Sequence, residues 1–139
     1  MDKNVIRGEI IDFCNKHGIT PYTIGEDVQG LYIDVDSHVI LAYCSLEYIP
    51  IRFRHVSGIF YCGYNELLSL KGCPIWIGGS FYCNNNKLTS LEYCPIWIGE
   101  NFYCYNNPLD ITSFCHSFEL GYDLSNIISN IDLVSIYRQ

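Results

Sequence analysis

Apolar and polar positions along the middle of the chain recur at a fixed period, the spacing that separates Phe60 from Phe81. Each unit starts with a phenylalanine, a tyrosine and a cysteine, and an asparagine and a leucine follow at fixed offsets. The recurring positions are Phe60, Phe81 and Phe102; Cys62, Cys83 and Cys104; Asn65, Asn86 and Asn107; Leu67, Leu88 and Leu109; and Cys73, Cys94 and Cys115. A fixed period of this length is the sequence signature of a solenoid, in which each unit stacks on the next.

A divergent unit precedes the regular ones. Counting back one period from Phe60 reaches Val39, and Leu41 then occupies the phase of the first cysteine. Residues 38–58 therefore predict a first coil. About four coils are expected over residues 38–115.

Segments with helical periodicity flank the coils. Residues 3–17 carry apolar side chains on one helical face, and Gly18 follows as a stop signal. The residues of that face are Val5, Ile6, Ile10, Phe13 and Cys14. A second helix is predicted over residues 123–137 by apolar residues at three-and-four spacing. The expected organisation is one domain over 1–139, with an N-terminal helix and lead-in cap (1–37), repeats (38–115) and a C-terminal helical cap (116–139).

Each unit contains the pattern F-x-C-x-x-N-x-L, which fits the latter part of the leucine-rich pattern L-x-L-x-x-N-x-L. In that geometry one short strand per coil joins a parallel sheet, the phenylalanine and cysteine point inward, and the asparagine satisfies backbone groups where the chain leaves the strand. We therefore expect a leucine-rich-repeat solenoid with a single parallel β-sheet of short strands and helical caps at both ends.

The units resemble the short leucine-rich repeats of bacterial effector proteins and, more closely, the small leucine-rich-repeat proteins encoded by tailed bacteriophages. The matching residues are Asn86 to Leu91, Cys94-Pro95, Ile98-Gly99, Phe102 to Cys104 and Ile33 to Asp36. The resemblance implies a protein-binding module in the cytoplasm of an infected bacterium that modulates or inhibits a host protein. It implies no catalytic residues, so we do not expect an enzyme.

Composition excludes several classes of partner. The net charge of −7 and pI near 4.8 oppose the phosphate neutralisation that sustains nucleic-acid binding, and no apolar run approaches the length of a membrane span. Six of the eight cysteines recur at the repeat period, so we expect reduced thiols packed in the core, with disulfides or a metal as alternatives. No cofactor is expected, and the cysteine spacings match no zinc pattern.

The lead-in segment alternates between apolar and polar residues from Leu31 to Asp36, which predicts a strand or hairpin arm. Asp34, Asp36 and His38 stand at alternate positions and carry groups that bind metals. The same pattern is typical of a solvated strand face, and we expect no metal site there.

Two rows of side chains are candidate partner-binding surfaces. The first is a concave ladder at the outward strand positions, made of Tyr61, Tyr82, Asn84, Tyr103 and Tyr105. Tyrosines provide large rigid contact areas, although stacked tyrosines also stabilise a sheet. The second is the Ile–Trp ridge, which comprises Ile75, Trp76, Ile96 and Trp97 and departs from the polar residues that the resembling proteins carry there.

The Ile–Trp ridge leaves three interpretations open. It binds a partner, it pairs two copies of the chain as a homodimer or other self-associating structural subunit, or its tryptophans fold back over the core. A carbohydrate-binding module is a further alternative, which the aromatic ladder with Asn84, Asn85 and Asn106 supports.

Overall fold

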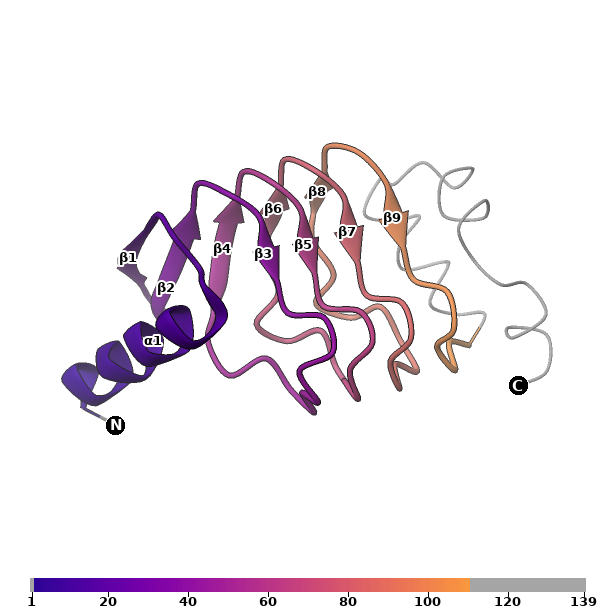
Figure 1. The fold of residues 1–139 in the computed structure, drawn as a ribbon, viewed down its shortest axis with the longest axis horizontal. Helices are drawn as coiled ribbons and strands as arrows, with labels where there is room; N and C mark the ends of the chain where they lie inside the picture. The colour runs from indigo at the N-terminus through magenta and orange to yellow at the C-terminus, as the bar shows by residue number, and fades with distance from the viewer. Residues whose placement is uncertain (1, 111–139) are drawn as a thin grey trace.

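The repeating units wind into a β-solenoid of about three turns in the computed structural model, which describes residues 2–110 (Figure 1). Each turn contributes one short strand to each of two sheets. The first sheet is parallel, has the order β3-β5-β7-β9, and consists of β3 (Val39–Ile40), β5 (Phe60–Tyr61), β7 (Phe81–Tyr82) and β9 (Phe102–Tyr103). The second has the order β1-β2-β4-β6-β8 and consists of β1 (Tyr22–Asp27), β2 (Gly30–Val35), β4 (Phe53–Val56), β6 (Trp76–Ile77) and β8 (Trp97–Ile98).

The prediction of a single sheet is wrong. The W-I-G segments pair between coils as the F-Y segments do, with Trp76 opposite Trp97 and Ile77 opposite Ile98. Glycine after each strand permits this close approach, because a Cβ built on Gly99 would lie 2.1 Å from the carbonyl oxygen of Gly78. The parallel strands and the inward phenylalanines and cysteines of the first sheet are confirmed.

Phenylalanine rings form a continuous column in the core between the two sheets. Ring centroids lie 5.0 Å apart for Phe53 and Phe60, 6.1 Å for Phe60 and Phe81, and 5.3 Å for Phe81 and Phe102. All four rings are buried, as are the cysteines that follow them in the repeats. The seven cysteines among residues 2–110 are free thiols.

The buried asparagines join each coil to the one before it. The side-chain Nδ2 of Asn86 donates to the carbonyl oxygens of Cys62 and Cys83, both at 3.0 Å, and its Oδ1 accepts from the backbone N–H of Leu67. Asn65 and Asn107 make the equivalent bonds one coil earlier and one coil later. The asparagine role predicted from the sequence is therefore confirmed.

An N-terminal helix closes one end of the solenoid. Helix α1 (Lys3–His17) begins at the N-cap Asp2, whose side chain accepts from the N–H of Asn4, and ends at Gly18, which has a φ of 63°. Its buried residues are Ile10, Phe13 and Cys14. Val5 was expected on this face but is 51% exposed.

The antiparallel hairpin of β1 and β2 leads from α1 into the second sheet, and so the predicted strand after Leu31 is confirmed. The predicted C-terminal cap over residues 116–139 and the end of the predicted fourth coil lie outside the described residues.

Candidate functional site

The tyrosine ladder lies on the outer side of the first sheet as a tight stack. Ring centroids are 4.5 Å apart for Tyr61 and Tyr82 and 4.4 Å apart for Tyr82 and Tyr103, with planes within 14° of parallel. Burial, and then the neighbouring Tyr103 hydroxyl, raise the pKa of Tyr82. Each ring is half-buried, so the ladder stabilises the sheet and still presents ring edges to solvent.

A second tyrosine stack, which sequence reasoning missed, lies where the chain turns out of the first sheet. The rings of Tyr43 and Tyr64 are 4.6 Å apart and nearly parallel. Burial, and then the charges of Tyr64 and Tyr103, raise the pKa of Tyr105. The signal was available, since Tyr43 and Tyr64 are one full period apart and share one phase of the repeat.

Asn84, expected to face a partner, is fully buried. Gly63 occupies its phase in the preceding coil, and a Cβ there would lie 2.9 Å from Asn84 Oδ1, so the amide fills the space that the glycine leaves. Its Nδ2 donates to Asn85 Oδ1 at 2.8 Å. Asn84 therefore offers no surface for direct contact.

The Ile–Trp ridge is exposed along the second sheet, with Trp76 on β6, Trp97 on β8, and Ile75 and Ile96 immediately before these strands. Its four side chains are between 37% and 61% exposed, and Trp97 has 56% of its surface accessible. Neighbouring strands place Trp76 beside Trp97 and His55 beside Trp76, with the His55 and Trp76 rings 5.8 Å apart. The interpretation in which both tryptophans fold back over the core is therefore wrong.

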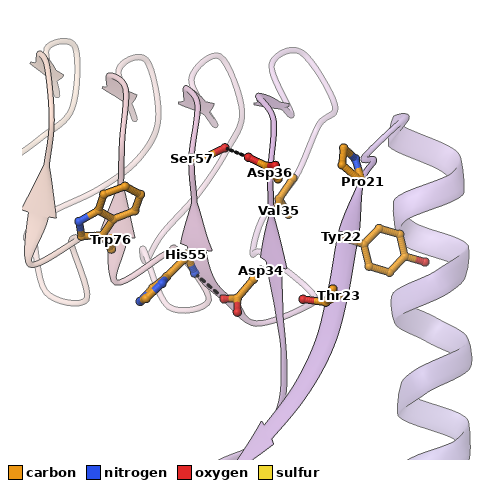
Figure 2. A pocket seen from close by; sticks show the side chains of 9 residues that line it. All are labelled: Pro21, Tyr22, Thr23, Asp34, Val35, Asp36, His55, Ser57 and Trp76. Atoms are coloured by element: carbon orange, nitrogen blue, oxygen red, sulfur yellow. Dashed lines mark hydrogen bonds between the residues drawn. The ribbon is translucent and has the colours of Figure 1, made fainter.

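A groove with a volume of about 370 Å³ adjoins the ridge (Figure 2). It crosses strands β1, β2, β4 and β6, and Trp76 belongs to both the groove and the ridge. Its lining residues are Pro21, Tyr22, Thr23, Asp34, Val35, Asp36, His55, Ser57 and Trp76. Sequence reasoning detected only the alternating aspartates of this region and did not connect them with the distant Trp76, because the sheet order that joins them was not foreseen.

The two carboxylates of the groove differ in their partners. Asp34 forms an ion pair with Arg54, whose Nε donates to Asp34 Oδ1 at 3.0 Å, and it accepts the backbone N–H of His55 at 3.0 Å. These bonds, Arg54 first, lower the pKa of Asp34. Asp36 accepts the hydroxyl of Ser57 at 2.8 Å. In residues 2–110, no ion pair involves Asp36.

Two arginines lie over a tyrosine ring on β2, the strand that carries Asp34. The guanidinium carbons of Arg52 and Arg54 lie 5.5 and 4.2 Å from the centroid of Tyr32, within the range of cation–π attraction. Arg52 also pairs with Asp27, and this hydrogen bond lowers the pKa of Asp27 to about 2. Both arginine charges are therefore committed to carboxylates on β1 and β2.

One thiol–imidazole contact links the helix to the first coil. Cys44 Sγ lies 3.8 Å from His17 Nδ1, and burial, followed by the charge of Lys16, lowers the pKa of His17. Cys44 is the one cysteine described here that is not buried. The sequence could not show this pair, because its members lie far apart along the chain.

Within the described part of the chain, no three His, Cys, Asp or Glu side chains are grouped so as to hold a metal ion. The same residues include no helix that is long and apolar enough to cross a membrane.

Comparison with protein-family models, curated proteins and solved structures gave no match to this chain. The fold and the surface thus define a β-solenoid with an exposed aromatic ridge and an adjoining groove.

Proposed function

We propose that this protein is a protein-binding solenoid and that the Ile–Trp ridge is its main contact surface. The observation that carries the proposal is the exposure of four large apolar side chains next to one another, with Trp76 and Trp97 on adjacent strands and Ile75 and Ile96 immediately before those strands. Contiguous exposed apolar patches usually mark interfaces, and tryptophan is among the residues most enriched at the positions that dominate binding energy.

The tyrosine ladder is the weaker candidate for the main contact. Its rings already stack closely on one another, so much of their surface is used inside the molecule. The ridge side chains leave more surface unused, with Ile96 61% exposed. The ladder, with Tyr61, Tyr82, Tyr103 and Tyr105, serves as a secondary contact surface in this proposal.

The finer identity rests on the sequence resemblance. The units over most of residues 19–115 resemble those of small leucine-rich-repeat proteins of tailed bacteriophages, which supports a leucine-rich-repeat protein that modulates or inhibits a host bacterial protein in the cytoplasm. The acidic charge favours a basic partner, because opposite charge accelerates encounter.

Affinity capture from bacterial lysate with a matched pair of variants tests the proposal. Ile96→Ser removes an apolar side chain of the ridge, whereas Leu68→Ser removes one of similar exposure, 67%, on a loop outside it. We expect a partner to be recovered with the wild type and Leu68→Ser and lost with Ile96→Ser. Equal recovery with all three proteins would contradict a role for the ridge.

Sedimentation at increasing protein concentration separates partner binding from self-association. A wild-type protein that remains monomeric supports the proposal. A dimer that Ile96→Ser abolishes and Leu68→Ser retains would instead assign the ridge to pairing of two copies.

A further inference from the structure

The groove beside the ridge is placed to receive one side chain of whatever protein covers the ridge. Trp76 forms a wall of the groove and is also a ridge residue. A partner segment seated on Trp76 and Trp97 therefore passes the mouth of the groove. The volume of about 370 Å³ lies in the range of small-ligand sites and suits one long side chain better than a folded element.

We propose that this groove binds a basic side chain of the protein partner, with arginine the best fit; the inference rests on the proposed protein-binding function. The described lining of the groove contains aspartates and no lysine or arginine. Arg54 satisfies the charge of Asp34, but no ion pair within residues 2–110 satisfies that of Asp36. The groove thus offers one uncompensated carboxylate in a protein whose net charge is −7.

The hydroxyl group of Ser57, beside Asp36, is oriented to accept hydrogen bonds from a ligand. Ser57 donates its hydroxyl proton to Asp36 at 2.8 Å, so its remaining lone pairs accept from a ligand (Figure 2). Lysine and arginine side chains only donate, and arginine carries five N–H groups in a fixed plane. A ligand of this kind meets both Asp36 and Ser57 with donors alone.

The distance across the groove requires a long side chain with an apolar stem. Asp36 follows β2, Trp76 lies on β6, and β4 runs between these strands. Adjacent strands are about 4.8 Å apart, and the register places Trp76 level with His55, two residues before the level of Asp36 and Ser57, so the backbones at Asp36 and Trp76 are separated by roughly 12 Å. Arginine matches this arrangement, because its stem packs on apolar surface and its guanidinium stacks on aromatic faces and pairs with carboxylates.

A sugar fits the groove less well. Its hydroxyl groups both donate and accept, and amide and cationic side chains are the groups that supply fixed donors to them. The described lining has no asparagine, glutamine, lysine or arginine side chain. Carbohydrate binding is therefore the competing outcome of the test.

Tryptophan fluorescence provides a direct assay. Trp97→Phe leaves Trp76 as the only tryptophan of the chain and keeps an aromatic ring on the ridge. This protein is titrated over the millimolar range with the peptide acetyl-Gly-Arg-Gly-amide. The same peptide with citrulline, a neutral group of the same shape, is the matched ligand, and methyl β-glucoside tests the sugar alternative.

We expect a saturable change in Trp76 emission with the arginine peptide and an affinity at least about tenfold lower with citrulline. Asp36→Asn should weaken arginine binding by a similar factor, whereas Asp12→Asn, which makes the same charge change on the exposed side of α1, should leave it unchanged. Circular dichroism confirms that each variant is folded.

Three results would overturn the inference: no saturable change with the arginine peptide, equal affinity for both peptides, or full arginine affinity in Asp36→Asn. Tighter binding of the glucoside than of the arginine peptide would show that the groove binds a sugar rather than a basic side chain. This titration uses no natural partner. If it fails while affinity capture still depends on the ridge, only the inference is rejected. If affinity capture does not depend on the ridge, the proposed function is rejected.

Discussion

Asn86 Oδ1 accepts a hydrogen bond of 3.0 Å from the backbone N–H of Leu67, which lies in the neighbouring coil. The same side chain donates to the carbonyl oxygens of Cys62 and Cys83. One buried amide thus satisfies backbone groups of two coils.

Asn86→Ala should lower the free energy of unfolding by about 1–3 kcal/mol, because removal of the amide leaves the backbone N–H of Leu67 without a partner. The carbonyl oxygens of Cys62 and Cys83 each lose one bond but still accept from Asn65 and Asn107. Urea denaturation followed by circular dichroism measures the change. Asn101→Ala, at an exposed position, is the matched control and should change stability by less than about 0.5 kcal/mol. Similar losses in both variants would contradict the joining role of Asn86.

The tyrosine ladder should contribute to stability as well as to the surface. Tyr82 stacks on Tyr61 and on Tyr103, so Tyr82→Ala should cost about 1–3 kcal/mol in the same denaturation assay. Tyr82→Phe keeps both stacks and should retain most of this energy. Tyr48→Ala, which truncates a tyrosine that is 68% exposed, is the control and should cost little. If Tyr82→Phe lowered the free energy of unfolding as much as Tyr82→Ala, the hydroxyl rather than the stack would be responsible.

Stability should fall in alkaline solution because of the buried thiols. Burial, and then the neighbouring Cys94, raise the pKa of Cys104 from its ordinary 9.0 to about 12. Between these values the unfolded chain releases the thiol proton while the folded chain keeps it. The unfolded state then binds fewer protons, so the free energy of unfolding decreases as pH rises, by about 1.4 kcal/mol per pH unit for one such group.

The dependence on pH is measured by urea denaturation from alkaline solutions near the ordinary thiol pKa upward. Cys104→Ala lowers the overall stability, but the slope of its free energy of unfolding against pH should be less steep than that of the wild type. Leu68→Ala, at an exposed position, should leave the slope unchanged. An unchanged slope in Cys104→Ala would show that this thiol ionises equally in both states.

Cys44 should be the first of the cysteines in residues 2–110 to react with iodoacetamide. It is partly exposed, whereas the other six are buried, and burial raises the pKa of Cys73 and Cys83 well above the ordinary value for a thiol. Because the thiolate is the reactive form, these core cysteines should be modified only after unfolding. Peptide mapping by mass spectrometry after brief treatment identifies the modified residue, and labelling of Cys83 as fast as Cys44 would contradict the closed core.

The repeat in the sequence was sufficient to predict most of the first sheet. Phe81 and Asn86 stand at fixed offsets from their equivalents, and equal offsets place equal residues in equal environments once the chain is known to coil. Helix α1 was also predictable, because its apolar residues share one helical face and Gly18 follows as a stop signal.

The second sheet and the groove were not predictable in the same way. The leucine-rich pattern describes one strand per coil, and no local rule shows that Trp76 pairs with Trp97 in a second strand. The groove depends on Asp36 and Trp76 lying two strands apart, which follows only from the sheet order. Asn84 was misplaced because its burial depends on the absence of a side chain at Gly63, in the neighbouring coil.

The pairing of Trp76 with Trp97 also fixes the geometry of any contact made along the ridge. Equivalent side chains there repeat at the separation of adjacent parallel strands, about 4.8 Å, which is shorter than the roughly 5.4 Å pitch of an α-helix. A regular helix laid along the row of coils therefore falls out of step with the coils by roughly 0.6 Å per turn, whereas strands stacked in the same direction keep the same spacing. The ridge thus favours partner surfaces whose own repeat is that of a β-sheet.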